Sequence, residues 1–186
     1  GAKAMIIAVY GSAKPAAGDA LYEEARRLGA LLARQGHTVM TGGYCGTMEA
    51  VSRGAAEAGG STIGVTCAEI ERYRPGGASP WVQVDIRTET LTQRLEVLTR
   101  QPDAMIALPG GVGTLAEISL ALNLAVISAV AAKPFILVGS AWRETFNTFY
   151  ARNNGFTSRE DFARLRFCQT PDEAFEMIQN NTLIGF

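Results

Sequence analysis

The chain has 186 residues, of which 47% are hydrophobic and 19% charged, the balance of a folded globular protein of one domain. Its 17 lysines and arginines against 18 aspartates and glutamates leave a formal net charge of −1, so no overall positive field exists to hold a nucleic acid. The longest uncharged run, Ile118 to Ala132, is shorter than the ~20 apolar residues of a membrane span. We therefore expect a cytoplasmic protein that binds neither nucleic acid nor membrane. Because the chain begins with Gly1 rather than Met, its first few residues are interpreted as the remnant of a cleaved tag.

Apolar runs of strand length alternate with longer stretches of helical period along the chain. The predicted strands are Met5–Tyr10, Thr38–Thr41, Thr62–Thr66, Trp81–Ile86, Ala104–Leu108, Phe135–Val138 and Arg166–Cys168. The predicted helices are Asp19–Arg34, Met48–Ala58, Glu89–Arg100, Leu115–Ala131, Trp142–Asn153 and Asp172–Gln179. This alternation is typical of an α/β fold, with a parallel sheet of about six to seven strands covered by helices on both faces.

The helix predicted over Leu115–Ala131 has no charged face, since after Glu117 only Ser119, Asn123 and Ser128 interrupt its apolar surface. A helix that is apolar all round must be buried. One small domain rarely covers both sides of a peripheral helix, so we expect this helix to pack against its copy in a homodimer. Burial within a single copy of the chain is the alternative.

Three turns rich in small residues follow predicted strands: Gly11–Ala13, Gly42–Thr47 and Pro109–Thr114. Open parallel sheets bind ligands outside the carboxyl ends of their strands. There, glycines let the backbone approach an anion, and the free N–H groups of a following helix favour a phosphate. The sequence therefore predicts a phosphorylated ligand, with tight structural turns as the alternative.

The residue types and motifs that the chain lacks argue against several kinds of catalytic and cofactor site. His37 is the only histidine and lies between a predicted helix and a strand, so no base is apparent for a serine or cysteine nucleophile. Cys45, Cys67 and Cys168 lie far apart without CxxC spacing, which argues against a zinc site and a disulfide framework. The third glycine loop matches GxGxxA, but no carboxylate ends the next strand to hold the ribose of NAD. We expect neither a cofactor nor a metal ion.

Carboxylates and arginines remain as candidates. Glu117 lies about one turn into a helix that starts at the third glycine loop, so its carboxylate could reach a ligand bound there. Thr114 to Glu117 is also the pattern of a capping box, and the spacing alone leaves both roles open. Arg94 flanks the buried stripe of its helix near the strand ends, where a guanidinium suits a bidentate grip on an anion. An arginine lying along the edge of the core is the alternative.

The nine residues from Pro109 to Glu117, PGGVGTLAE, match PGGxGTxxE, the hallmark of the Lonely Guy (LOG) family, whose members are often labelled lysine decarboxylase-like. Val9–Ser12 resembles the first-strand turn of that family and Thr41–Met48 its second glycine loop, so the resemblance covers nearly the whole chain. It implies a Rossmann-like homodimer that hydrolyses the N-glycosidic bond of a nucleoside 5′-monophosphate of the AMP or cytokinin riboside type. The products would be the free base and ribose 5-phosphate. The three lysines offer no Schiff-base site, which argues against a decarboxylase.

The resemblance also implies which residues form the site. Glu117 and Arg94 would be catalytic, with Glu117 stabilising an oxocarbenium-like state or orienting water and Arg94 gripping an anion or a ribose oxygen. The phosphate would be held by Gly110, Gly111, Val112, Gly113 and Thr114. Further contacts are predicted from neighbouring strand ends, at Ser12, Gly42, Gly43 and Thr47. Additional candidates are Glu69 or Glu71, in the long connection Cys67–Pro80, and Asn123.

The chain departs from the family pattern at two places. Leu95 follows Arg94 where cytokinin-activating members usually carry a lysine, which argues against cytokinin specificity. Glu49 adds a carboxylate at the first turn of a predicted helix, where it would repel a phosphate or serve the helix dipole. The alternative function is therefore a non-catalytic carrier of a nucleotide or of the molybdenum cofactor, with the same fold.

Overall fold

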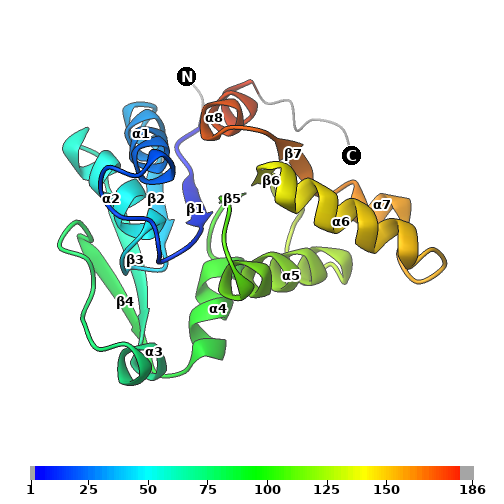
Figure 1. Cartoon of the computed structure of the whole chain (residues 1–186), viewed down its shortest axis with the longest axis horizontal. Helices are drawn as coiled ribbons and strands as arrows, with labels where there is room; N and C mark the ends of the chain where they lie inside the picture. The colour runs from blue at the N-terminus through cyan, green and yellow to red at the C-terminus, as the bar shows by residue number, and fades with distance from the viewer. Residues whose placement is uncertain (1–2, 181–186) are drawn as a thin grey trace.

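The computed structural model of the protein describes residues 3–180, and within them seven parallel strands form one sheet with helices on both faces (Figure 1). The strands are β1 (Ile6–Tyr10), β2 (Thr38–Thr41), β3 (Thr62–Cys67), β4 (Val84–Thr88), β5 (Ala104–Ala107), β6 (Phe135–Val138) and β7 (Arg166–Cys168). The helices are α1 (Ala20–Arg34), α2 (Thr47–Glu57), α3 (Ala68–Tyr73), α4 (Leu91–Arg100), α5 (Val112–Val126), α6 (Ser140–Arg152), α7 (Arg159–Phe162) and α8 (Pro171–Gln179). This arrangement confirms the predicted α/β fold.

Two hydrophobic layers hold the helices on the sheet. Side chains of successive strand residues alternate between the faces, so that Ile7 and Val9 belong to one layer and Ala8 and Tyr10 to the other. The first layer packs under α1, α2 and α8, and the second under α4, α5 and α6. Strands β5 and β6 are buried along their whole length, which explains why the sequence reads as continuous apolar runs there.

The order of the strands is β4-β3-β2-β1-β5-β6-β7, so the direction in which the chain adds strands reverses between β1 and β5. At such a reversal the loops on either side diverge and leave a crevice outside the carboxyl ends of the strands. The three glycine-rich turns follow β1, β2 and β5, which are neighbours in the sheet. The fold therefore brings all three turns to the same edge, around this crevice.

The helix predicted at Leu115–Ala131 is α5, which runs from Val112 to Val126. It begins three residues earlier and ends five residues earlier than predicted. It ends where Ser128 adopts a left-handed backbone conformation, with φ of 56°, which a helix cannot continue through. In the part of the chain that the structure describes, no helix is both long and apolar enough to cross a membrane.

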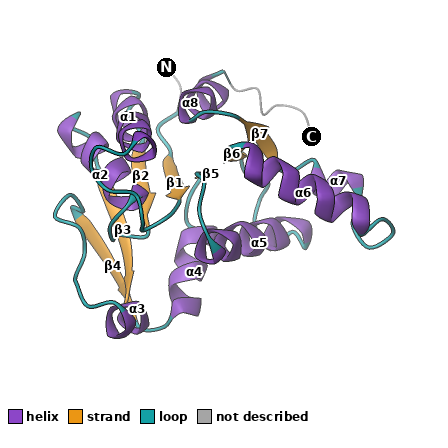
Figure 2. Cartoon of the chain, in the orientation of Figure 1, coloured by secondary structure: helices purple, strands orange, loops and turns teal. Residues whose placement is uncertain are grey.

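Strand β4 begins at Val84, not at Trp81 as predicted. Its ladder with β3 starts with Val84 opposite Ile63, whereas the carbonyl oxygen of Trp81 accepts a hydrogen bond from the hydroxyl of Thr62 (2.7 Å). The long connection after β3 contains the short helix α3 and then a loop that runs back to the start of β4 (Figure 2). Helices as short as α3 and α7 carry too few turns to show a period, so neither was predicted.

Helices α1 and α2 approach each other closely through two glycines. A Cβ atom added to Gly54 would collide with the backbone carbonyl oxygen of Arg26, and one added to Gly29 would collide with that of Val51. Because both collisions are with backbone, no side-chain rotation relieves them. The close contact of these helices covers one end of the first hydrophobic layer.

We expect Gly54→Ala to lower the free energy of unfolding by about 1–3 kcal/mol, measured by urea denaturation, because the two helices must move apart. This loss should occur even though alanine is the better helix former by ~1 kcal/mol. The control is Gly113→Ala, at a helical glycine with no atom within 4 Å of the added Cβ, which should leave stability unchanged or slightly raised. Equal effects of the two substitutions would contradict this account of the packing.

Candidate functional site

The third glycine loop leads directly into α5, with Gly111 as the residue before the helix. Within residues 3–180, none of the backbone N–H groups from Gly110 to Thr114 donates a hydrogen bond to the protein. A Cβ atom at Gly111 or Gly113 would meet no atom within 4 Å, so the space beside the loop is open. An open helix N-terminus with free N–H groups is suited to bind a phosphate. The loop is therefore open to solvent at a helix N-terminus, while the hydroxyl of Thr114 is buried against Gly110.

Glu117 does not cap the helix. A capping glutamate stands at the third helical position, but α5 begins at Val112, so Glu117 is its sixth residue. The capping-box interpretation of Thr114 to Glu117 is therefore wrong. The similar pattern from Thr170 to Glu173 does form a capping box at the start of α8, with both of its hydrogen bonds present.

The Glu117 carboxyl group is buried without a hydrogen bond to satisfy it. Glu117 is only 7% exposed to solvent, and its Oε2 atom has no hydrogen-bond partner in the described part of the chain. Burial raises the pKa of Glu117 from 4.5 to about 7, although the positive charge of Arg94 opposes the rise. A buried polar atom without a partner costs free energy, and groups of this kind collect at functional sites. A carboxyl group with a pKa near neutrality can hold or release a proton at neutral pH.

Arg94 is fixed by backbone oxygens of strand β3 and of the turn after β2. It is only 6% exposed, and its Nε donates to the carbonyl oxygen of Val65 (2.8 Å) while its Nη2 donates to that of Gly42 (2.8 Å). These bonds leave Nη1 as the guanidinium nitrogen without a hydrogen bond to the described residues. Arg94 can therefore donate to a ligand through Nη1 alone, whereas the sequence suggested a bidentate contact. Its charge acts on Glu117, whose pKa it lowers.

The loops after β1 and β2 are tied to each other. Both the N–H (2.9 Å) and the hydroxyl (3.2 Å) of Thr47 donate to the carbonyl oxygen of Ser12. The N–H of Gly43 donates to the hydroxyl of Thr41 (3.1 Å), and Gly43 has a φ of 82°, which favours glycine. Thr47 and Gly43 thus use their donors to shape the second loop. The hydroxyl of Ser12 accepts from the N–H of Lys14 (3.1 Å) and keeps its own proton available.

Other candidates named from the sequence lie away from the crevice or are already bonded. Glu69 accepts the N–H of Leu91 (2.7 Å), and Glu71 pairs with Arg87 (2.6 Å), so both carboxylates hold α3 against its neighbours. Asn123 is exposed and lies about 16 Å along the helix axis from the start of α5. The structure does not bring Asn123 to the glycine loops.

Glu49 serves as a contact between helices. It lies in the first turn of α2, and its carboxylate accepts a hydrogen bond from the hydroxyl of Tyr22 on α1 (2.7 Å). Its charge is therefore engaged by α1 as well as placed near the positive end of α2. Of the two roles considered for this residue, the structure supports the structural one.

Tyr44 is part of the site but was not predicted from the sequence. Its hydroxyl donates to the carbonyl oxygen of Cys67 (3.1 Å) and accepts from the N–H of the same residue (2.7 Å). The Cζ atoms of Arg94 and Arg74 lie 5.5 and 5.8 Å from the centre of its ring, within the range of cation–π contacts. The signal available in the sequence was a bulky aromatic residue among the small residues of a glycine loop.

Comparison with known proteins identifies the family. Residues 4–162 match the model of the SLOG cluster4 family. The chain belongs to the SLOG cluster4 family. The resemblance to the LOG family is thereby confirmed, and a cytokinin riboside 5′-monophosphate phosphoribohydrolase of Mycobacterium tuberculosis is 38% identical to this chain over 113 residues. That match covers 60% of this chain and 59% of the mycobacterial protein.

Solved structures extend the likeness over almost the whole SLOG cluster4 chain. The molybdenum cofactor binding protein of Rippkaea orientalis has a TM-score of 0.74 and 27% identity, covering 97% of this chain and 98% of that one. The molybdenum cofactor carrier protein of Chlamydomonas reinhardtii has a TM-score of 0.72 and 26% identity, covering 97% and 99%. The chain is thus similar both to a named enzyme and to named carriers.

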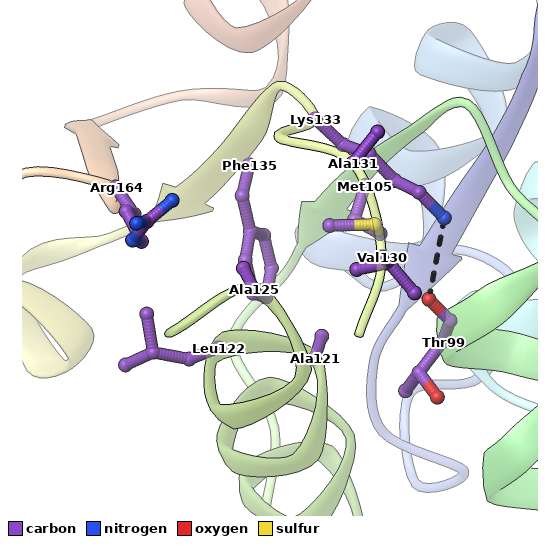
Figure 3. Close-up of a pocket in the computed structure, with 10 residues that line it drawn as sticks. All are labelled: Thr99, Met105, Ala121, Leu122, Ala125, Val130, Ala131, Lys133, Phe135 and Arg164. Atoms are coloured by element: carbon purple, nitrogen blue, oxygen red, sulfur yellow. Dashed lines mark hydrogen bonds between the residues drawn. The ribbon is translucent and has the colours of Figure 1, made fainter. Parts of the chain in front are cut away.

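A small cavity lies elsewhere in this SLOG cluster4 protein, between α4, α5 and strands β5 and β6 (Figure 3). It has a volume of about 20 Å³, which is room for about one water molecule. At its rim, Nζ of Lys133 donates to the carbonyl oxygens of Thr99 (3.5 Å) and Arg100 (2.7 Å) at the end of α4. A cavity this small cannot hold a nucleotide.

The pKa of Glu117 predicts how stability depends on pH. Between about pH 4.5 and 7 the folded protein retains a proton on Glu117 that the unfolded chain has lost, so its stability should fall as the pH rises through this range. The expected loss is on the order of 3 kcal/mol. Urea denaturation at several pH values should show a smaller loss in Glu117→Gln, which removes this proton linkage and leaves other titrating groups in place. The same pH slope in both proteins would contradict the assignment.

Proposed function

We propose that this protein hydrolyses the N-glycosidic bond of a nucleoside 5′-monophosphate, giving the free base and ribose 5-phosphate. The observation that carries the proposal is the buried carboxyl group of Glu117 on the helix whose first N–H groups are free. The name of the mycobacterial relative, a cytokinin riboside 5′-monophosphate phosphoribohydrolase, supports the same reaction class.

The spacing along α5 suits such a substrate. The residues from Val112 to Glu117 span about 7 Å of helix axis, and helical side chains tilt back toward the N-terminus. A phosphate bound at the start of the helix would therefore place the anomeric carbon of its ribose near the Glu117 carboxyl group. The loop would hold the phosphate through backbone N–H groups from Gly110 to Thr114, with Ser12 as a further donor.

The reaction can proceed without histidine or a metal ion. As the bond between the anomeric carbon and the base nitrogen breaks, positive charge develops on the ribose, and ionised Glu117 stabilises it. The same carboxylate orients a water molecule, which adds its hydroxyl group to the anomeric carbon, while a proton ends on the departing base. Arg94 favours the ionised form of Glu117, because its positive charge lowers the pKa of that carboxyl group.

The purified protein should release base and ribose 5-phosphate from a panel of nucleoside 5′-monophosphates, including AMP, IMP, GMP and isopentenyladenosine monophosphate. The corresponding nucleosides should not react, because they lack the phosphate that the helix N-terminus binds. Release of base from the nucleosides at equal rates would show that the glycine loop does not recognise phosphate. No release from any nucleotide would contradict the hydrolase.

Glu117→Gln should lower kcat by about 100-fold or more while the variant stays folded, because glutamine keeps the shape but not the charge. In the unmodified protein, kcat/KM should rise with pH to a plateau above about 7, as Glu117 ionises. The control is Glu24→Gln, the same change on an exposed residue of α1, which should retain full activity. An active Glu117→Gln variant would remove Glu117 from the mechanism.

A non-catalytic carrier of a nucleotide or of the molybdenum cofactor is the second candidate function. The observation in its favour is the likeness to two named molybdenum cofactor proteins over 97% of this chain. A carrier would use the same free N–H groups to hold a phosphorylated ligand without cleaving it. Thermal stabilisation by a ligand from which no product forms would favour this function over the hydrolase.

We also propose that the protein is a homodimer with α5 at the interface. Within one copy, α5 buries a single stripe of residues: Thr114, Glu117, Ile118, Ala121 and Leu124. Its apolar residues at the two ends stay uncovered, with Val112 83% and Ile127, just beyond the helix, 66% exposed. A helix with apolar residues outside its buried stripe is suited to pack against a second copy.

Sedimentation velocity should give about twice the chain mass of 19.8 kDa. Ile127→Glu should shift the protein toward the monomer, because a charge would be buried in the interface. The matched control is Glu144→Gln, at an exposed position of α6, which should leave the mass unchanged. A wild-type protein that sediments as a monomer would overturn the proposal.

A further inference from the structure

The loop between α3 and β4 rests on the second glycine loop at two consecutive residues. At one end, the guanidinium group of Arg74 lies 5.8 Å from the ring centre of Tyr44. At the other, the N–H of Ser79 donates to the carbonyl oxygen of Gly43 (2.8 Å). The loop is therefore fixed beside the crevice, close to the residue that also contacts Arg94.

On this side of the crevice several hydrogen-bond acceptors already have a donor from the protein. Four backbone carbonyl oxygens have donors: those of Gly42 and Val65 accept from Arg94, that of Gly43 from Ser79, and that of Cys67 from Tyr44. The carboxylates of Glu69 and Glu71 are engaged with Leu91 and Arg87. Each of these groups is therefore already bonded within the protein.

Arg74, by contrast, has donors to offer. Its side chain is exposed, and within the described residues it makes neither a hydrogen bond nor an ion pair, only the contact with Tyr44. A guanidinium group carries five N–H donors and no acceptor. Burial and, to a smaller extent, repulsion by Arg74 lower the pKa of Arg94, so the two guanidinium groups lie within electrostatic range. Arg94 in turn acts on Glu117, which links Arg74 to the reacting end of the crevice.

We propose that Arg74 contacts the base of the bound nucleotide and makes the site select a 6-oxopurine, as in IMP and GMP, over adenine. The inference rests on the proposed nucleotide site, with the phosphate at α5 and the ribose at Glu117. The O6 and N7 atoms of a 6-oxopurine are adjacent acceptors, which a guanidinium group can bond with two parallel hydrogen bonds. Adenine places an amino donor beside N7, so its amino group would face the N–H donors of Arg74.

The other arginines of this region fit the role less well. Arg87 is paired with the carboxylate of Glu71 at 2.6 Å. Arg72 is exposed, like Arg74, but has no contact with Tyr44 among the described contacts. Arg72 is therefore a matched control, since the same substitution there removes the same charge two residues away.

The test is binding of IMP and AMP, by isothermal titration calorimetry, to the full chain and to Arg74→Gln, Arg74→Lys and Arg72→Gln, all carrying Glu117→Gln so that turnover does not disturb the binding equilibrium. The full chain should bind IMP about tenfold more tightly than AMP. Arg74→Gln should reduce the ratio of the two affinities to about one, mainly by weakening the binding of IMP. Arg72→Gln should leave that ratio unchanged. Arg74→Lys keeps the charge but not the planar pair of donors, so it should recover at most part of the ratio.

Equal affinity for IMP and AMP in the protein that keeps Arg74 would overturn the inference. An unchanged ratio of these affinities in Arg74→Gln would overturn it as well. Assays of ribose 5-phosphate release separate it from the proposed function. Selective, Arg74-dependent binding of IMP without product release would support the base assignment and reject the hydrolase. Hydrolysis with equal kcat/KM for IMP and AMP would support the hydrolase and reject the base assignment. Failure of every nucleotide to bind would reject both proposals.

Discussion

A buried guanidinium group holds the site of this protein together. Arg94 comes from α4, on one face of the sheet, and bonds to two neighbouring parts of the sheet, at Val65 within β3 and at Gly42 just after β2. Any side chain at position 42 would collide with the guanidinium group, so the glycine there is a consequence of the bond. The position of Tyr44 and the charge felt by Glu117 follow from the same placement.

Much of the fold could be predicted because its cause is local. The burial of β5 and β6 on both faces shows directly as unbroken apolar runs, and the glycine loops follow strands at the places where turns are required. The role of Glu117 could not be settled in the same way. Whether it caps the helix or is buried beside the crevice depends on a helix start three residues upstream, at Val112, and the pattern of Thr114 to Glu117 fits both cases.

The hydrogen bonds of Arg94 could not be predicted from the sequence either, because its partners are 29 and 52 residues away along the chain. Helical spacing placed the side chain beside the buried stripe, but only the packed structure shows that its donors are used by backbone oxygens of β3 and of the turn after β2. Tyr44 is a similar case, since its importance comes from a contact with Cys67 in another strand. Residues that act through long-range contacts leave no periodic signal in a single sequence.

A hydrolase and a carrier could share this arrangement, because holding a phosphate and cleaving a sugar bond draw on different atoms. The free N–H groups of α5 are sufficient for the first task. The second needs a carboxyl group kept close to its charge transition by burial on one side and a fixed cation on the other, as Glu117 is. Small changes around that carboxyl group would decide between turnover and storage without altering the fold.

Under the proposals made above, phosphate binding and base selection would fall to separate stretches of chain. The phosphate loop belongs to the β5–α5 turn, whereas the α3–β4 connection is anchored on Gly43 and Tyr44 of the second loop. A graft that replaced this connection with one of different length and composition would leave the phosphate loop covalently and spatially intact. If the nucleotide site is as proposed, the selecting segment could be exchanged while the anchoring loop stays constant, which is the property that a scaffold for new nucleotide specificities requires.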